Sequence, residues 1–425
     1  MVCYTGGKMD TSRNKPMMDY EPVERIPAEE LRDRASRLQE LTREAGVDGV
    51  FATQNADVYY LSGTLQQAQI YLPASGQPVV MVRKHAGRSA ADSSLSAEMI
   101  VAVKSLRELP GIIEKAGERP RTLGFELDTL PVSTFQAYEK ALKPLEAQLV
   151  DASALFRRVR AIKSDYEVGL IRRAATVADA ALKAAAANLR EGIREVELAA
   201  LVEGAARVAG HSGTIRIRAY GQEMHMGQLL AGRSGGVPSF MNSPTGGAGV
   251  GPWSPVGAGN RQIMRGEPVF LDYTGEWGGY IADQTRMLSI GKLDSFWLDA
   301  FGAMRKVQEK LVRAVRPGIS SGDFYDMAVG FASDLGYANN FMGPSDEESP
   351  GQRATFVGHG VGLELDEWPP LQRGTDARLD VGMVLAVEPK VIYPGRGAIG
   401  IEDTYLLMPG GLDPLTFSTR EIIEV

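Results

Sequence analysis

The sequence has few cysteines, no long apolar runs and no excess of positive charge, and each of these absences excludes a class of function. Its single cysteine, Cys3, cannot form an internal disulfide, which excludes a disulfide-stapled secreted scaffold and allows a reducing compartment. No apolar run approaches the roughly 18 residues of a membrane span, and residues 1–22 lack the apolar segment of a signal peptide. The net charge of −7 argues against a surface that binds duplex nucleic acid. Together these absences predict a cytoplasmic protein that binds neither nucleic acid nor membranes.

The pattern along the chain predicts two domains after a tail. With 425 residues, of which 44% are apolar, the chain can bury more than one core. Residues 1–26 show no periodicity and are predicted to be a flexible tail. Residues 27–160 alternate short apolar runs (49–52, 79–82 and 123–125) with helical stretches, among them a helix from Pro27 to Gly46 and another over 132–142. This alternation predicts a small α/β domain.

Residues 161–425 contain an internal repeat. Two long helical stretches, 171–189 and 298–315, each end at a glycine turn and are followed by a second helix. Ile193 and Ile319 occupy equivalent places in the two copies, as do Gly210 and Gly336, and both pairs are separated by 126 residues. The repeat predicts a pseudo-symmetric α+β domain whose site draws side chains from both halves. A chance match of two helical hairpins is the alternative.

Acidic residues follow or lie within several of the predicted strands. Asp272 follows the apolar run 269–271, and Asp283 comes eleven residues later, after a glycine-rich turn. A hairpin would bring these two carboxylates together, and adjacent anions repel unless a proton or a cation lies between them.

Three further groups complete the set. His359 stands in a Gly-His-Gly-Val-Gly segment, Glu388 follows the strand 383–387, and Glu402 lies in another strand pattern. Alone, each could be an edge residue or an ion-pair partner. Together, four carboxylates and one imidazole suit a pair of divalent ions such as Mn, Co, Fe or Zn.

The local sequences around these residues resemble those of the pita-bread metallopeptidases, which include methionine aminopeptidase, prolidase, aminopeptidase P and the metal-free creatinase. The similar segments are Asp-x10-Asp-x-Thr-Arg from Asp272, Gly-His-Gly-x-Gly-Leu around His359, Gly-Met-Val-x3-Glu-Pro ending after Glu388, and Ile-Glu-Asp-Thr around Glu402. The segment 160–164 also resembles the interdomain junction of the prolidase and aminopeptidase P branch. The resemblance covers roughly residues 30–425. It implies a creatinase-like domain at 27–160, a pita-bread catalytic domain at 161–425 and, commonly, a homodimer.

The resemblance also implies a role for each residue. Asp272 would chelate one metal ion, Asp283 and Glu402 would bridge two ions, and His359 and Glu388 would bind the second. A bridging water or hydroxide would attack the scissile carbonyl, and Glu388 would pass the proton to the leaving amine.

Three positions depart from the family pattern. The peptidases usually have a second histidine seven residues after the first, where this chain has Asp366. They also have a histidine about 17 residues before the first aspartate, where this chain has Trp253-Ser254-Pro255. Prolidase-like members often have an arginine two residues before the last glutamate, where this chain has Gly400. An ionised Asp366 would repel a developing oxyanion, whereas a protonated Asp366 could donate to it, which makes Asp366 a candidate catalytic residue.

Trp253, His225 and Trp368 are the candidate substrate contacts, although a structural role is the competing interpretation for His225 and for His211. The sequence therefore predicts a dimetal hydrolase of the Xaa-Pro aminopeptidase or dipeptidase type, which removes the N-terminal residue from short Xaa-Pro peptides. One alternative is a metal-dependent hydrolase or lyase that acts on a non-peptide small molecule. A second alternative is a metal-binding scaffold without catalysis.

Overall fold

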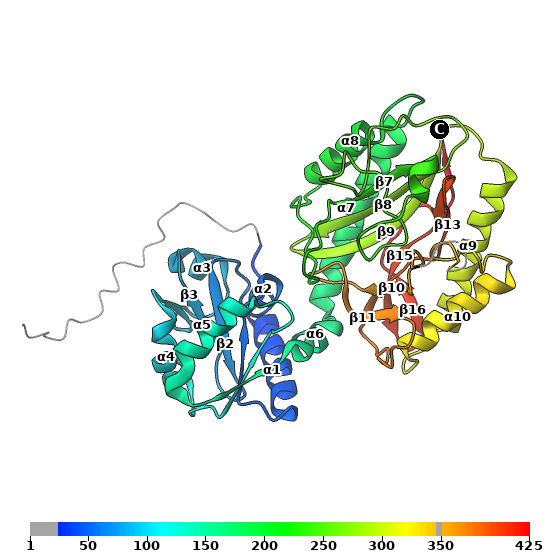
Figure 1. Ribbon diagram of the computed structural model, residues 1–425. Coiled ribbons are helices and arrows are strands. Elements are labelled where there is room, and N and C mark those ends of the chain that lie inside the picture. Colours follow the sequence, from blue (N-terminus) through cyan, green and yellow to red (C-terminus); the bar gives the residue numbers. More distant parts are fainter. Residues whose placement is uncertain (1–23, 346–350) are drawn as a thin grey trace, which may run out of the picture. The chain divides into compact units, whose positions relative to one another are not determined.

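The computed structural model describes residues 24–345 and 351–425, which divide into two compact units (Figure 1). The first unit ends at Val159 and the second begins at Arg160. The predicted tail lies outside the described residues as far as residue 23, and so does Cys3.

The first unit is built on one mixed six-stranded sheet with the strand order β4-β3-β2-β1-β5-β6. Its strands are β1 (Gly49–Ala52), β2 (Ala68–Pro73), β3 (Val79–Val82), β4 (Ile100–Ala102), β5 (Thr122–Phe125) and β6 (Gln148–Asp151). Its helices are α1 (Ala28–Glu44), α2 (Asn55–Ser62), α3 (Ala86–Asp92), α4 (Leu109–Ala116) and α5 (Val132–Leu142), and α6 (Ser153–Ala161) crosses the boundary between the units. The prediction of an α/β fold here is confirmed.

The core of the first unit forms where the central strands carry aromatic residues. Strand β1 is buried at all four positions, and Phe51 stacks on Phe125 of β5 with ring centroids 4.8 Å apart. Tyr138 of α5 packs against both rings, at 6.0 and 5.3 Å between centroids. Burial of such large rings is a main source of stability in a small sheet domain.

The second unit contains the two copies of the repeat. The first copy comprises α7 (Asp165–Asn188), α8 (Glu195–Val208), β7 (Gly227–Ala231), β8 (Val269–Trp277) and β9 (Tyr280–Ser289). The second comprises α9 (Ser295–Ala314), α10 (Ser321–Asp334), β10 (Phe356–Gly360), β11 (Glu367–Gln372), β12 (Val384–Val387), β13 (Lys390–Tyr393), β14 (Gly397–Gly400), β15 (Asp403–Met408) and β16 (Gly411–Pro414). The terminal β17 (Ile423–Glu424) pairs with β9.

Each helix pair covers its own strands. Helices α7 and α8 share a core with β7, β8 and β9, in a sheet ordered β17-β9-β8-β7. Helices α9 and α10 share a larger core with the sheet β11-β10-β12-β15-β16 and the pair β13-β14. Figure 1 shows the strands lying between the two helix pairs. The pseudo-symmetric α+β fold predicted from the 126-residue offset is confirmed.

The predicted hairpin is formed by β8 and β9, which turn at Gly278 and Gly279. Both glycines have positive φ, 59° and 85°, as a two-residue hairpin of the I′ type requires. The strand extends well beyond the apolar run 269–271 and Asp272, and continues to Trp277. In this continuation Gly275 lets α7 approach closely: a β-carbon there would lie 1.8 Å from the carbonyl oxygen of Ala174.

Among the helices that the structure describes, none is both long and apolar enough to span a membrane.

Candidate metal centre

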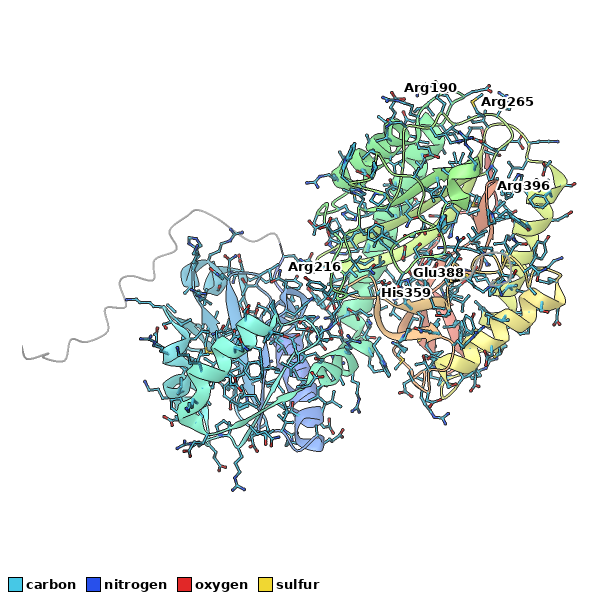
Figure 2. All side chains as sticks on the ribbon, viewed as in Figure 1. Arg190, Arg216, Arg265, His359, Glu388 and Arg396 are labelled. Carbon is cyan, nitrogen blue, oxygen red and sulfur yellow. The ribbon has the colours of Figure 1, made fainter. Side chains whose placement is uncertain are left out.

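The five residues that the sequence singled out meet in one cavity of the second unit. Asp272 lies on β8, Asp283 on β9 and His359 on β10, while Glu388 directly follows β12 and Glu402 directly precedes β15. Figure 2 shows His359 and Glu388 next to each other, and Nε2 of His359 lies 3.8 Å from Oε1 of Glu388. The two halves of the repeat therefore both supply side chains, because β8 and β9 belong to one and the other three residues to the second.

The ring of His359 is oriented by the main chain. Its Nδ1 lies 3.0 Å from the carbonyl oxygen of Gly360, which can only accept, so Nδ1 carries the proton. The lone pair is thereby left on Nε2, which faces Asp283 Oδ2 at 3.9 Å. Fixing the tautomer through one ring nitrogen prepares the other nitrogen to bind a metal ion.

Main-chain pairing joins β9 to the segment that carries Glu402. Thr285 and Glu402 exchange two main-chain hydrogen bonds of 3.3 Å, and the Thr285 hydroxyl donates to Glu402 Oε2 at 2.8 Å. Thr404 binds both the amide and the carbonyl of Asp283. The two carboxylates predicted to bridge metal ions are therefore held by adjacent strands.

A lysine that the sequence analysis did not single out lies among these carboxylates. Nζ of Lys390 is 3.0 Å from Asp272 Oδ2, 2.6 Å from Glu388 Oε2 and 3.0 Å from Glu402 Oε2. Its side chain is 2% exposed. The available signal was a charged residue at the start of the apolar run 390–393, where an apolar residue is expected.

Burial and mutual repulsion dominate the electrostatics of the cavity. Burial raises the pKa of Asp272 to about 6, with Lys390 opposing the shift and Glu402 adding to it. Burial, then the charges of Glu402 and Asp272, raises the pKa of Asp283 well above its usual value. Carboxylates so close together can all be ionised only when cations lie between them.

The pKa values of the two basic groups are also raised, but here burial opposes the shift. Burial alone lowers the pKa of Lys390, but Asp272, Glu388 and Glu402 outweigh it and hold the pKa well above its usual value. Burial also lowers the pKa of His359, whereas nearby acids, first Asp366, raise it further than burial lowers it. The excess of negative charge in the cavity therefore favours bound cations.

The donor atoms fit a divalent ion. Ligand atoms of Asp283, His359 and Glu402 all lie within 4.8 Å of one another. Oε1 of Glu402 is buried and has no hydrogen-bond partner among the described residues. A buried carboxylate oxygen without a partner is costly, and a metal ion would satisfy it. Carboxylate and imidazole donors suit borderline divalent ions.

The remaining predicted residues lie at different distances from this centre. Asp366 lines the cavity with its side chain 39% exposed, and its Oδ1 is 3.7 Å from His359 Nδ1, on the side of the ring away from the carboxylates. Trp253 is 81% exposed, and neither it nor His225 or Trp368 lines the cavity. Trp368 lies on β11 and packs against the core of α9 and α10.

His211 has structural partners. It is buried, its Nδ1 accepts from the amide of Gly213 at 2.9 Å, and its Nε2 lies 3.4 Å from the Thr274 hydroxyl. This placement agrees with the structural interpretation of His211.

Much of the remaining cavity lining comes from segments that contain no recognised motif. It consists mainly of neutral polar and apolar side chains from the strand β7 and the segments around it: Ile217, Gln222, Met224, Gln228, Met241, Asn242, Ser243 and Pro244. Their sequence spacing follows no metal or nucleophile motif, because it depends on how long loops fold back.

The segment 160–164 has a clear structural role. Arg160 and Lys163 both bind the buried carboxylate of Glu367, with Lys163 Nζ 2.9 Å from Oε2. The other oxygen, Oε1, accepts from the amide of Leu363 at 2.8 Å. Gly362 is required here, since a β-carbon would lie 2.6 Å from both oxygens of Glu367. The junction motif therefore shapes the loop that carries Asp366.

Fold and site together define a metallohydrolase of two-domain architecture, and comparison with known families agrees. Residues 169–409 match the model of metallopeptidase family M24, and residues 34–162 match the creatinase/prolidase N-terminal domain. The chain belongs to metallopeptidase family M24. The resemblance stated from the motifs is confirmed, and so is the prediction of a metallopeptidase-type hydrolase.

Individual relatives cover almost the whole chain. An Xaa-Pro dipeptidase of Pyrococcus horikoshii is 26% identical over 394 residues, which span 92% of this chain and 99% of that protein. The structure of the prolidase from the same organism superposes with a TM-score of 0.74 at 25% identity, covering 92% of this chain and all of that one. An Xaa-Pro dipeptidase from Bacillus anthracis has a TM-score of 0.77 at 23% identity, covering 93% and 100%, and shows the shared fold.

Proposed function

We propose that this protein is a divalent-metal-dependent peptidase that removes the N-terminal residue from short Xaa-Pro peptides. The observation that carries the proposal is the meeting of Asp272, Asp283, His359, Glu388 and Glu402 in one cavity of a family M24 fold. Relatives that align over nearly the full chain are named Xaa-Pro dipeptidases. Asp283, His359 and Glu402 would hold a divalent ion, with Glu388 next to them.

A bound divalent ion would lower the pKa of a water molecule and polarise the scissile carbonyl. The protein's own residues would do the rest. Glu388 is 4% exposed and lines the cavity, so it can take a proton from the attacking water and deliver it to the leaving amine. Nε2 of His359 would help to hold the ion. Asp366 stands at the exposed rim, where the family has a histidine, and is the candidate for contact with the substrate.

Other parts of the proposal rest on the sequence. They are the homodimer, the cytoplasmic location and the domain boundaries 27–160 and 161–425. The pair of divalent ions with a bridging hydroxide also comes from the sequence, and it is the alternative to a single ion at Asp283, His359 and Glu402. The number of ions depends on what occupies the space among Asp272, Glu388 and Glu402.

The test is hydrolysis by the purified full-length protein, reconstituted with Mn²⁺ or Co²⁺. A panel of Xaa-Pro dipeptides and longer Xaa-Pro peptides is compared with the same peptides carrying alanine in place of proline. We expect cleavage of the proline series only, and its loss on chelation. Glu388→Gln should lower kcat by about 10²–10⁴-fold, the usual contribution of a general acid–base. Glu309→Gln, on the surface of α9, is the matched control. Near-normal turnover by Glu388→Gln would remove its proton-transfer role.

A second candidate function follows from substitutions at two positions. Asp366, which lines the cavity, and Gly400, which does not, replace groups that peptidases of this family use on their substrates, and the cavity lining includes amides such as Gln222 and Gln228. These features favour a non-peptide small molecule as the substrate of a metal-dependent hydrolase or lyase. Stoichiometric metal binding without cleavage of any peptide in the panel would support this candidate against the first.

A further inference from the structure

The ammonium of Lys390 occupies the position of a cation in the carboxylate cluster. An ammonium has three N–H donors, and Nζ of Lys390 has three carboxylate oxygens within 3.0 Å, one each from Asp272, Glu388 and Glu402. All its donors are therefore used within the cluster. Lys390 holds these three acids in place and has no proton left to offer a substrate.

The stem of this lysine is also fixed. Lys390 pairs with Gly400 between β13 and β14, and a β-carbon at Gly400 would lie 2.6 Å from Cγ of Lys390. Any larger residue at position 400 would clash with the lysine stem and also with the main chain of Pro389 and Lys390. The ring of Phe270 lies beneath the ammonium, with Nζ 5.3 Å from its centroid. The glycine that replaces the family's arginine is therefore the space that Lys390 needs.

The two carboxylate oxygens of Glu402 differ in their contacts. Oε2 accepts from Lys390 and from the Thr285 hydroxyl, whereas Oε1 is buried without a partner among the described residues. Asp283, His359 and Glu402 supply the only compact set of three potential metal ligands found in the described part of the chain. Asp272, predicted to chelate the other ion, does not belong to that set, and its Oδ2 lies 3.0 Å from Nζ of Lys390.

We propose that Lys390 replaces one of the two metal ions of the family, so that each chain holds a single divalent ion at Asp283, His359 and Glu402. A metal ion lies about 2.0–2.2 Å from carboxylate oxygens. An ion at that distance from Asp272 Oδ2 and Glu402 Oε2 would stand against the ammonium that now contacts both oxygens, and the two positive charges would repel. The cluster therefore contains two cations: one exchangeable divalent ion and the ammonium of Lys390.

This inference rests on the proposed metal site, but not on the identity of the substrate. If no peptide is cleaved while one ion is bound per chain, the proposed peptidase activity fails and this inference stands. If peptides are cleaved while two ions are bound, the reverse holds.

The experiment counts metal ions in the full-length protein. Wild type is saturated with Mn²⁺, and bound metal is measured by elemental analysis and by titration calorimetry. We expect one ion per chain. Electron paramagnetic resonance of the same sample should show isolated Mn²⁺, without the exchange coupling of a dinuclear pair. Two ions per chain, or a coupled spectrum, would overturn the proposal.

Variants at four positions, one of them a control, then identify the site of the ion. Lys390→Ala should raise the count to two, because it frees Asp272 and one oxygen of Glu402. Lys163→Ala is the matched control, since Lys163 is another buried lysine paired with a glutamate, and its count should remain one. Asp272→Asn should keep one ion, whereas Asp283→Asn should lose it. A count of one in folded Lys390→Ala, or loss of metal in Asp272→Asn, would contradict the proposal. The wild-type spectrum decides the question if Lys390→Ala does not fold.

Discussion

The hydroxyl of Thr404 binds both main-chain polar groups of Asp283. It accepts from the Asp283 amide at 2.8 Å and donates to the Asp283 carbonyl oxygen at 2.8 Å. Since Thr404 lies two residues after Glu402, this single side chain sets the position of Asp283 relative to Glu402. The hydroxyl therefore holds two candidate metal ligands from distant parts of the sequence in register.

Thr404→Val should separate the effect of the hydroxyl from the effect of side-chain shape. The variant keeps the branched shape but leaves two buried main-chain groups unpaired, which should cost about 1–3 kcal/mol in the free energy of unfolding. Affinity for Mn²⁺ should fall as well, because Asp283 can then move. Denaturant unfolding and metal titration measure the two effects. Thr404→Ser keeps the hydroxyl and should bind metal as wild type does. Equal stability and metal affinity in Thr404→Val and wild type would show that these bonds are unimportant.

The buried carboxylate of Glu367 should make stability fall in acid. Burial raises its pKa, but the charges of Arg160 and Lys163 outweigh burial and lower the pKa from 4.5 to about 2. A lowered folded-state pKa stabilises the protein above the unfolded-state pKa, and that stability is lost as the pH falls from about 4.5 towards 2. It amounts to about 3 kcal/mol at neutral pH.

Unfolding experiments on Glu367→Gln test this dependence. At pH 7 the free energy of unfolding of the variant should be lower than that of wild type. The difference between the two should be smaller at pH 3. The comparison within one pH removes contributions from the other acids. A gap that stays constant between pH 7 and pH 3 would mean that the ionisation of Glu367 is not linked to folding.

The buried ion pair of Arg286 and Asp403 is connected to the metal cluster through the main chain of Glu402. Arg286 donates to the carbonyl oxygen of Glu402 at 2.6 Å and also binds Asp403 Oδ1, which accepts from Thr416 as well. Arg286→Met should destabilise the protein by about 3 kcal/mol, at the low end for a broken buried ion pair, because the buried Asp403 charge keeps only Arg420, whose Nε lies 3.5 Å from Asp403 Oδ2. The double variant Arg286→Met/Asp403→Asn should recover part of that loss. A double variant whose loss equals the sum of the two single losses would rule out this coupling.

Glycine at position 358 is required by the packing of β10 against β12. A β-carbon on Gly358 would lie 2.1 Å from the carbonyl oxygen of Ala386. Gly358→Ala should force the strands apart, lower stability by about 1–3 kcal/mol and weaken metal binding through the adjacent His359. Gly330→Ala on α10 is the control, since a β-carbon there meets nothing within 4 Å and should stabilise the helix by about 1 kcal/mol. Thermal unfolding and metal titration distinguish the two variants.

The sequence predicted regular elements well wherever the local pattern determines them. The strands at 49–52 and 79–82 and the helix at 132–142 have the predicted bounds. The β8–β9 hairpin was also predicted, because two adjacent glycines mark its turn. The length of β8 was not predicted, and no local sequence pattern records the close packing of α7 on Gly275 in its second half.

The sequence predicted the acids and the histidine of the metal cluster, but not the lysine that neutralises part of their charge. The four acids and His359 stand in recognisable motifs, so their meeting could be expected. Lys390 was overlooked because its importance depends on Asp272 and Glu402, which are 118 and 12 residues away. The departure at Gly400 was noticed as a missing arginine, and only its pairing with Lys390 explains it. Trp253, His225 and Trp368 remain predictions for substrate contact.

The attachment of Arg160 and Lys163 to Glu367 has a consequence for protein engineering. A chimera that takes its first unit from a relative must keep residues 160–163 of this chain with the catalytic unit. A crossover placed after these residues would replace Arg160 and Lys163 with the residues of the relative. The buried carboxylate of Glu367 could then lose its ion-pair partners. The suitable crossover point therefore lies just before Arg160, within the helix α6.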